Sequence, residues 1–347
     1  MSFINFNEIV KEAWSAYDPT RTILTITDIS AKVSTNHVYR VTFKDGNFII
    51  AKLSYFGKFE HFVEDHSIIN SLSNNLQDPF ENFLARSLIK ENSLFVHRHQ
   101  DEVIDAWVVF YRPVKIKRKL PKRIDETQIQ KLAKQFAKFH KSCHTIRNTL
   151  PSSSKTLEVD VKHLLDILDS NYGKHEYRMH QDQIRKHCDL FLENVAKLDA
   201  NELDTIPVFV DWNIGNFSVT PEFKLFSRWD YDWFRISSRM IDFYFFARIS
   251  SNVGDKTVFS YDIDPMMEDR FVIFLKAYHK EFPLTRTEIL FLKEAYRFFI
   301  LNYVVKYGKY FFHEIFATKL QQEAYQRYLP QLDQKFDPEP LLKALDL

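Results

Sequence analysis

The chain has 347 residues, of which 45% are hydrophobic and 27% are charged, the composition of an ordinary globular protein. Lys and Arg number 47 against 46 Asp and Glu, so net charge gives no reason to expect a nucleic acid or an anionic membrane as partner. Two cysteines, Cys143 and Cys188, are too few for a disulfide scaffold or a cysteine metal site, and they fit a reducing compartment.

The N-terminal third predicts a helix followed by a small, mainly antiparallel sheet. Residues 1–14 have an amphipathic pattern instead of the basic start and apolar core of a signal peptide, so we expect a cytoplasmic protein. Asp45-Gly46 marks a hairpin, and an apolar stripe at 59–75 predicts one inserted helix. The expected strands lie in five runs rich in β-branched and aromatic residues: 23–34, 38–46, 48–54, 84–98 and 102–114.

The pattern changes to helical after a basic connector at 115–123. Helices are expected in the following stretches: 126–146, 158–171, 179–198 and most of the chain beyond 239. The apolar stretch 297–312 contains two lysines and is too short to span a membrane. We therefore predict an α+β fold with two lobes, a β-rich lobe over residues 1–113 and a mainly helical lobe over 114–347.

A short polar motif interrupts the helical lobe between two strand-like pieces, 207–210 and 223–230. Asp211 directly follows the first piece, Asn216 comes five residues later, and Asp230 ends the second. A hairpin formed by the two pieces would bring both acids and the amide to one end of a ribbon. Such oxygen ligands suit Mg²⁺, and a carboxylate without a metal could accept a proton. Alone, the motif is also compatible with an ordinary turn.

The order of the other polar residues favours phosphoryl transfer. That reaction needs an amine for the nucleotide phosphates, a carboxylate to position the amine, a base and metal ligands. Lys52 lies in a predicted strand and Glu64 on the helix that follows it. Asp211, Asn216 and Asp230 come next, in that order, so the chain contains every residue type that the reaction needs.

The sequence resembles the aminoglycoside phosphotransferase and choline kinase family, whose members are relatives of protein kinases. The family's catalytic loop reads roughly H-x-D-x-x-x-x-N and is followed by a metal-binding acid at a strand end. FVDWNIGN at 209–216 and WDYD at 229–232 are similar to these motifs. Further similar stretches are NHVYRV at 36–41, LAKQFAKFH at 132–140 and the acid Asp242. The resemblance covers about residues 30–310 and implies a bilobal, protein-kinase-like fold.

The resemblance also implies a role for each candidate residue. Asp211 would be the catalytic base or would orient the acceptor hydroxyl. Mg²⁺ would be held by Asn216 and Asp230, with Asp232 as a second metal contact. ATP would be held by the following groups: the Lys52 amine at the α- and β-phosphates, Glu64 steadying that amine, and the backbone from Tyr111 to Pro113 as a hinge that receives adenine. Asp242 would brace the catalytic loop through its backbone, and His140 would be a packed structural histidine.

Two departures from the family pattern define an alternative. Phe209 replaces the histidine of the catalytic motif, and the loop at 31–41 contains no glycine. Ser34, Thr35 and Asn36 would then have to approach the phosphates with hydroxyl and amide groups.

The chain is predicted to be an ATP-dependent, magnesium-assisted kinase for a hydroxyl of a small metabolite. The alternative is a catalytically degenerate kinase-like binding protein, or pseudokinase.

The identity of the acceptor stays open between an amino alcohol, a choline-like molecule, an aminoglycoside and a sugar. Aromatic and acidic residues cluster around the motif: Trp212, Tyr231, Asp232 and Trp233. Together they could favour an amine or quaternary ammonium acceptor through cation–π contact.

Overall fold

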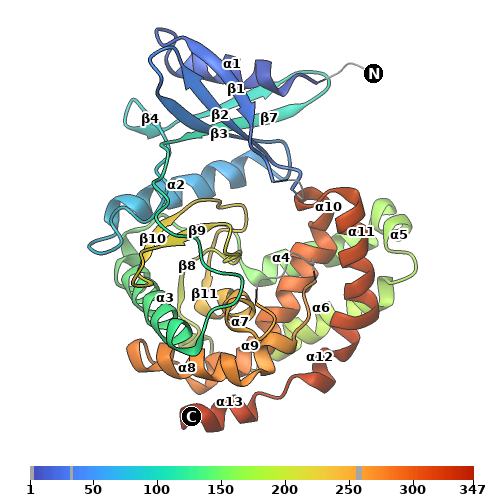
Figure 1. Ribbon diagram of the computed structural model, residues 1–347. Coiled ribbons are helices and arrows are strands. Elements are labelled where there is room, and N and C mark those ends of the chain that lie inside the picture. The colour runs from blue at the N-terminus through green and yellow to red at the C-terminus, as the bar shows by residue number, and fades with distance from the viewer. Residues whose placement is uncertain (1–3, 32–33, 255–259) are drawn as a thin grey trace.

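A five-stranded antiparallel sheet with the strand order β1-β2-β3-β7-β6 forms the small lobe at the top of Figure 1. Its strands are Ile23–Asp28 (β1), His37–Phe43 (β2), Phe48–Ser54 (β3), Val96–Gln100 (β6) and Asp105–Tyr111 (β7). The predicted hairpin at Asp45-Gly46 joins β2 to β3, and Gly46 has the positive φ, 81°, that favours glycine. The computed structural model describes residues 4–31, 34–254 and 260–347.

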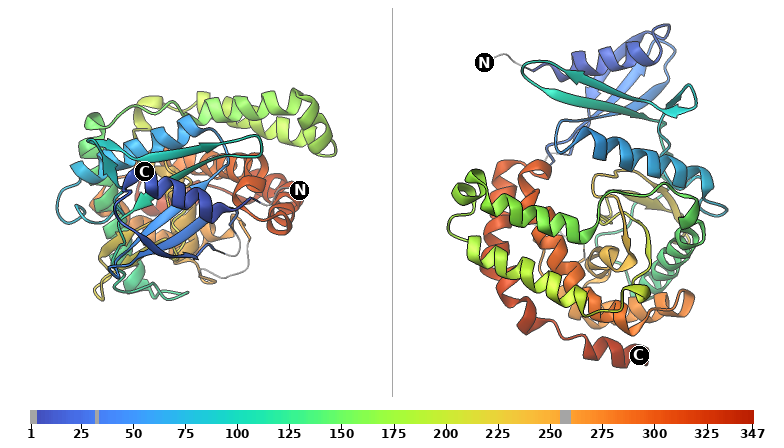
Figure 2. Two further views of the ribbon diagram at one scale, coloured as in Figure 1. Left: turned by 90° about the horizontal axis from the view of Figure 1, so that it is seen from above. Right: turned by 180° about the vertical axis from the view of Figure 1, so that it is seen from behind.

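Two helices flank the sheet, and each contributes to the hydrophobic core of a different lobe. Helix α1 (Phe6–Tyr17) packs on the sheet and buries Val10 and Trp14 in the core of the small lobe. Helix α2 (Phe59–Asn75) lies between the lobes in Figures 1 and 2, and its Ile68 and Leu72 belong to the core of the large lobe. The position of one lobe on the other is therefore set partly by buried apolar contact.

The large lobe is built mainly of helices, so the predicted bilobal α+β fold class is confirmed. These helices are Glu126–Ile146 (α3), Leu157–Asp169 (α4), Asn171–Glu176 (α5), Gln181–Ala196 (α6), Phe243–Ser250 (α7), Asp269–Glu281 (α8), Arg286–Phe299 (α9), Gly308–Phe311 (α10), Glu314–Glu323 (α11), Leu329–Lys335 (α12) and Glu339–Leu345 (α13). A π-helical turn, Ile300–Lys306, continues α9. Among the described residues, no helix has both the length and the apolar character needed to cross a bilayer.

Two short ribbons in the large lobe surround the polar motif. Strand β8 (Thr205–Val208) pairs with β11 (Arg235–Ser238), and β9 (Phe217–Val219) pairs with β10 (Leu225–Arg228). The expected single hairpin between 207–210 and 223–230 is therefore wrong. Strand β9 lies next to β10 in sequence, and the short loop between them costs less entropy to close than the long loop after β8.

The predicted boundary between the lobes at 113/114 stays a prediction. Strand β7 ends at Tyr111 and α3 begins at Glu126, so the connector between them holds the basic stretch 115–123. A further ribbon of two-residue strands, Ile89–Lys90 (β4) and Ser93–Leu94 (β5), precedes β6.

Candidate functional site

The catalytic-loop candidate begins with a tight turn directly after β8. Val210 has a φ of 60°, a conformation that is unusual for a β-branched residue, and the amide of Asp211 donates to the carbonyl of Phe209 at 2.6 Å. The carboxylate of Asp242 accepts hydrogen bonds from the amides of Phe209 (3.1 Å) and Val210 (2.6 Å). The predicted bracing role of Asp242 is confirmed, and its bonds stabilise the turn that presents Asp211.

Asp242 is in turn anchored in the core of the large lobe. Its other carboxylate oxygen lies 3.0 Å from Nε2 of His140, and Nδ1 of His140 lies 2.8 Å from the hydroxyl of Tyr278. Both Asp242 and His140 are fully buried. The structural role expected of His140 is confirmed, and the network ties the loop to α3 and α8.

Asp211 and Asn216 face each other across the loop. The side-chain amide of Asn216 donates to one carboxylate oxygen of Asp211 at 3.0 Å, and the backbone amide of Asn213 donates to the other at 3.2 Å. Burial raises the pKa of Asp211 to about 7, and the negative charge of Asp230 acts in the same direction. A carboxyl that titrates near neutral pH has the proton affinity that suits a general base.

Arg228 is a component of the site that the sequence did not reveal. It is fully buried at the end of β10, and its guanidinium lies 4.1 Å from the ring of Trp212 and 4.6 Å from that of Phe209. Its Nη2 donates to the carbonyl of Asp211 at 2.9 Å. Phe209 therefore stacks on a buried cation at the position where the family pattern has histidine.

Lys52 meets two acids from the large lobe. Its Nζ lies 3.0 Å from Oδ1 of Asp230 and also pairs with Oδ1 of Asp232. Although burial opposes ionisation, pairing with Lys52 keeps the pKa of Asp230 below its usual value. Burial raises the pKa of Asp232 to about 6, and the nearby charge of Asp230 adds to this rise. The structure thus brings together Lys52 and Asp230, which the sequence placed in one site.

Glu64 does not pair with Lys52, which corrects the expectation. Its Oε1 accepts hydrogen bonds from the hydroxyl of Ser153 at 2.9 Å and from the amide of Ser154 at 2.8 Å. The next residue, Asp65, points into the protein and pairs with Lys155 at 2.6 Å. Helix α2 is therefore turned so that Glu64 contacts the segment before α4, and the acids beside Lys52 come from the chain after β10.

The hinge candidate, Tyr111 to Pro113, offers few free donors. The amide of Arg112 donates to the carbonyl of Arg86 at 2.9 Å, and Pro113 has no amide hydrogen. The hydroxyl of Tyr111 is hydrogen-bonded to Nε2 of His66 at 2.5 Å. Adenine binding at this hinge stays a prediction.

The loop that was expected to face the nucleotide is bonded to the large lobe. Ser34 forms a β-bridge with Phe312, and the amide of Thr35 donates to the carbonyl of Phe311 at 3.4 Å. The hydroxyl of Thr35 donates to the carbonyl of Tyr310. We call these contacts between Ser34–Thr35 and Tyr310–Phe312 the loop tether.

Other polar groups of the same loop are engaged as well. The amide of Asn36 donates to the hydroxyl of Ser34 at 3.1 Å, and its side-chain amide donates to Asp232 at 2.5 Å. Residues 32–33 lie outside the described residues. The hydroxyl of Thr35 and the side-chain amide of Asn36 would therefore have to exchange partners in order to donate to phosphates, whereas the hydroxyl of Ser34 only accepts a bond here.

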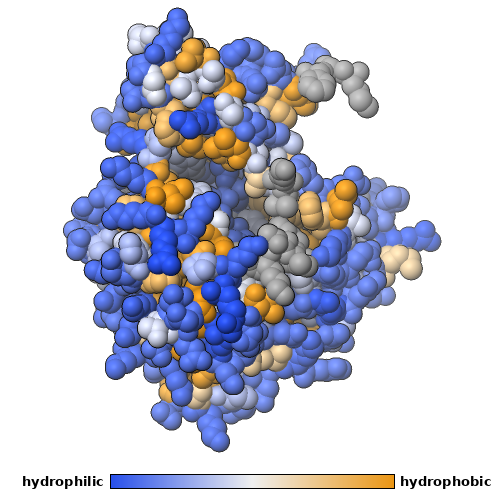
Figure 3. Space-filling view, in the orientation of Figure 1, coloured by the Kyte–Doolittle hydropathy of each residue, from blue (hydrophilic) through white to orange (hydrophobic). Residues whose placement is uncertain are grey.

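A pocket of about 170 Å³ collects the expected chemistry. It is lined by Asp211, Asn216, Asp230 and Asp232 from the large lobe and by Ser34 from the small lobe. The surface is hollowed between the lobes in Figure 3. The pocket therefore gathers the predicted base and all three predicted metal ligands.

The donor set fits a magnesium ion. Within the described ranges, no three His, Cys, Asp or Glu residues are grouped to hold a metal by themselves. Mg²⁺ commonly takes one or two protein oxygens and completes its shell with phosphates and water. The Asp230 carboxylate and the Asn216 amide oxygen supply such ligands. Asp232 already has both oxygens engaged, so a metal contact would require it to give up a partner.

The four aromatic and acidic residues that could favour a cationic acceptor do not all face the pocket of Asp211. Trp212 is fully buried, with the Arg228 guanidinium against its ring. The hydroxyl of Tyr231 donates to the backbone carbonyls of Ala85 and Arg228, both at 3.1 Å. Only Trp233 and Asp232 of the four expected residues line the pocket of Asp211.

No protein-family model matches the sequence, and no curated protein matches it. Solved structures that match include an amicoumacin kinase in complex with AMP-PNP and Ca²⁺ (TM-score 0.65, 14% identity, 97% of each chain covered). A microcompartment-associated aminopropanol kinase matches with a TM-score of 0.60 and 16% identity, covering 94% of this chain and 98% of that one. A choline kinase from Streptococcus pneumoniae matches with a TM-score of 0.56 and 13% identity, covering 95% and 99%.

In each comparison the similarity extends over nearly the whole length of both chains. Because the sequence identities are low, these comparisons establish the fold and not the function. The chain therefore has the protein-kinase-like fold that its resemblance to the aminoglycoside phosphotransferase and choline kinase family predicted.

Proposed function

We propose that this protein, which shares its fold with small-molecule kinases, is an ATP-dependent, magnesium-assisted phosphotransferase acting on a hydroxyl of a small molecule. The observation that carries the proposal is one pocket in which Asp211, with a pKa near 7, lies with Asn216 and Asp230 while Lys52 reaches Asp230 at 3.0 Å. A base, two oxygen ligands and an amine are the parts that phosphoryl transfer requires. The matched amicoumacin, aminopropanol and choline kinases support the same class.

Asp211 would orient the acceptor hydroxyl and take its proton while the hydroxyl oxygen forms a bond to the γ-phosphorus and ADP leaves. Asp230 and Asn216 would hold Mg²⁺, which offsets negative charge on the phosphates when it is bound. Lys52 would bind phosphate oxygens. Asp242 accepts hydrogen bonds from the amides of Phe209 and Val210, so it would hold the backbone that carries Asp211 during the reaction.

We assign the positioning of Lys52 to Asp232 instead of Glu64. Asp232 pairs with Lys52 through one oxygen and accepts from Asn36 through the other. This places a fixed carboxylate beside the amine, the task that phosphoryl transfer requires of an acid near this lysine.

A cytoplasmic location is part of the proposal. Cys143 and Cys188 are both buried and unbridged, which suits a reducing compartment. A small hydroxylated molecule is the proposed partner, and its class stays open between amino alcohols, choline-like molecules, aminoglycosides and sugars.

Nucleotide binding is the first test. Thermal unfolding is measured with ATP alone and with ATP plus Mg²⁺, because a ligand specific for the folded state raises the melting temperature. We expect a magnesium-dependent increment that is lost in Asp230→Asn and kept in Asp204→Asn, a control at an exposed acid outside the site. Absence of any shift at millimolar ATP would contradict the proposal.

Turnover is the second test. ADP release is measured with ATP, Mg²⁺ and a panel of hydroxylated acceptors. With a productive acceptor, Asp211→Asn is expected to slow release by about 10²–10⁴-fold. A pseudokinase would instead bind ATP and release no ADP with any acceptor, and equal rates in wild type and Asp211→Asn would refute the assigned base.

A further inference from the structure

Residues 115–123, the basic connector between β7 and α3, form an exposed cationic surface. The segment reads KIKRKLPKR, and its six Lys and Arg side chains are all exposed. Its backbone is fixed, because Leu120 is buried in the core of the large lobe and the amide of Val219 donates to the carbonyl of Arg118 at 2.9 Å. In Figure 1 the connector crosses the side of the large lobe that faces the viewer. The cations are therefore held on one face of the molecule.

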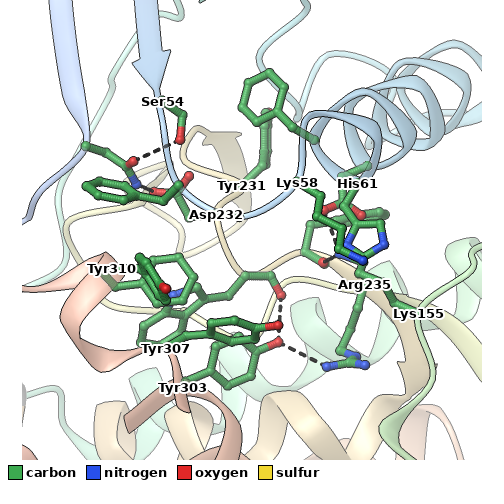
Figure 4. Close-up of a pocket in the computed structure, with 18 of the residues that line it drawn as sticks. Ser54, Lys58, His61, Lys155, Tyr231, Asp232, Arg235, Tyr303, Tyr307 and Tyr310 are labelled. Atoms are coloured by element: carbon green, nitrogen blue, oxygen red, sulfur yellow. Dashed lines mark hydrogen bonds and ion pairs between the residues drawn. The ribbon is translucent and has the colours of Figure 1, made fainter. Parts of the chain in front are cut away.

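These cations differ from those beside the cleft in how their charge is balanced. Lys155 and Arg235, both drawn in Figure 4, are paired with acids: Lys155 with Asp65 at 2.6 Å and Arg235 with Asp160 at 2.9 Å. Within the described part of the chain, no acid forms an ion pair with a cation of the basic connector. The charge of the connector is therefore available to attract an anionic partner.

Two exposed aliphatic side chains lie with these cations. Ile116 is 51% exposed within the basic connector, and Val253 is 52% exposed in the loop after α7. That loop is joined to the connector, because Nε of Arg123 donates to the carbonyl of Asn252 at 3.0 Å. Cations and aliphatic side chains are therefore combined on one surface.

This combination fits an anionic membrane better than a nucleic acid. Clusters of about four to eight Lys and Arg residues are attracted to anionic lipid surfaces, and aliphatic side chains enter the boundary between the headgroups and the acyl chains. Single-stranded nucleic acids are held by aromatic rings on which the bases stack. Two rings beside the connector are covered by its own cations: Nζ of Lys117 lies 4.3 Å from the centre of the Phe226 ring, and the guanidinium of Arg118 lies 5.3 Å from that of Phe223.

We propose that the basic connector, together with Val253, binds the surface of a membrane that contains anionic phospholipids. The cations would contact the headgroups, and Ile116 and Val253 would enter the boundary of the acyl chains. The near-zero net charge of the whole chain does not oppose this binding, because salt screens exposed charges beyond about 8–10 Å and the local cations decide the attraction. Figure 3 shows the hollow between the lobes on the face that the connector crosses, so the cleft would open beside the bilayer.

Cosedimentation of the full chain with vesicles tests the proposal. We expect binding to vesicles of phosphatidylserine and phosphatidylcholine in equal parts, weaker binding as salt is added, and no binding to phosphatidylcholine alone. The triple variant Lys115→Gln, Lys119→Gln, Lys122→Gln should bind about 100-fold more weakly, because each cation near an anionic surface raises the affinity about fivefold.

A control variant loses the same charge elsewhere. Lys174→Gln, Lys186→Gln, Lys197→Gln replaces three exposed lysines of α5, α6 and the residue after α6, helices that lie at the front when the molecule is seen from behind (Figure 2, right). This variant should bind like wild type. Asp211→Asn should also bind like wild type, so a failure of the proposed phosphotransferase activity leaves the outcome unchanged. Melting temperatures check that each variant is folded.

The aliphatic contact has a variant of its own. Ile116→Ser should weaken binding about fivefold, because it removes apolar surface that the membrane would cover. Equal binding of wild type to both kinds of vesicle, equal affinities in the connector variant and the control variant, or unchanged affinity in Ile116→Ser would overturn the inference. Tighter binding to a single-stranded RNA oligonucleotide than to the anionic vesicles at the same salt concentration would assign the surface to nucleic acid and would also overturn it.

Discussion

The candidate catalytic loop around Asp211 and the loop that was expected to face the nucleotide are held in opposite ways. The amides of Phe209 and Val210 meet a fully buried carboxylate, Asp242, which the core of the large lobe anchors. Thr35, in contrast, is held by carbonyls of a distant segment through the loop tether, in a partly exposed position. The backbone that carries Asp211, the proposed base, is therefore anchored in the core, whereas Thr35 and Asn36 would have to exchange bonds in order to contact a nucleotide.

The largest effect should come from removing the buried anchor. Asp242→Ala leaves two loop amides and His140 without their partner, and we expect a loss of about 3–5 kcal/mol in the free energy of unfolding. Urea denaturation measures this. Asp204→Ala, which removes an exposed acid beside His144, should cost at most about 1 kcal/mol. Equal costs would show that the core does not hold the catalytic loop.

The pH dependence tests whether the fixed loop also sets the acidity of the base. Burial and Asp230 raise the pKa of Asp211 to about 7, so kcat/KM should fall as the pH decreases through 7 and the carboxylate is protonated. The charge of Arg228 opposes this rise, so Arg228→Met should move the rising limb to higher pH. A limb that stays in place would assign the titration to another group.

Substitution of Asp232 and of Glu64 tests which of these acids positions Lys52 for the binding of ATP. Asp232→Asn should raise KM for ATP several-fold because the amide no longer offsets the charge of Lys52. Glu64→Gln should leave KM for ATP near the wild-type value, since Glu64 contacts Ser153 and Ser154. The reverse ranking, measured by initial rates at saturating acceptor, would restore Glu64 as the partner of Lys52.

The smallest effect is expected at the loop tether. Thr35→Val removes one exposed hydrogen bond to Tyr310 and should change the free energy of unfolding by less than about 1 kcal/mol. If the tether competes with nucleotide, the same change should strengthen ATP binding a few-fold, because more molecules are competent to bind. Thr20→Val, which removes a local bond to Asp18, is the matched control. Weaker ATP binding in Thr35→Val would mean that the hydroxyl contacts the nucleotide.

The sequence predicted those parts of the fold and site that depend on local pattern. The helix at 59–75 and the Asp45-Gly46 hairpin follow from periodicity and turn chemistry, and both are found. Asp211 and Asn216 became candidates because their spacing within one loop is similar to a known family's catalytic motif, although that spacing alone also suits an ordinary turn. Such features need no knowledge of distant partners.

The parts that escaped prediction depend on contacts between distant segments. Arg228 looks like any strand-end arginine until Trp212 and Phe209 enclose it. The orientation of Glu64 depends on how α2 packs between the lobes, and the tether to Phe311 depends on a segment from the far end of the chain. No periodicity in the sequence reports such pairings.

The π-helical turn Ile300–Lys306 has a consequence for how this chain tolerates insertions and deletions. It lies just before the segment that forms the loop tether, and its Asn302 lines a cavity beside the start of α2. Gain or loss of one residue there would rotate the following helix by about 100°, because an α-helix has 3.6 residues per turn. Tyr310 and Phe311 would then face away from the small lobe. Length changes should be tolerated in the exposed loops and rejected between residues 300 and 312.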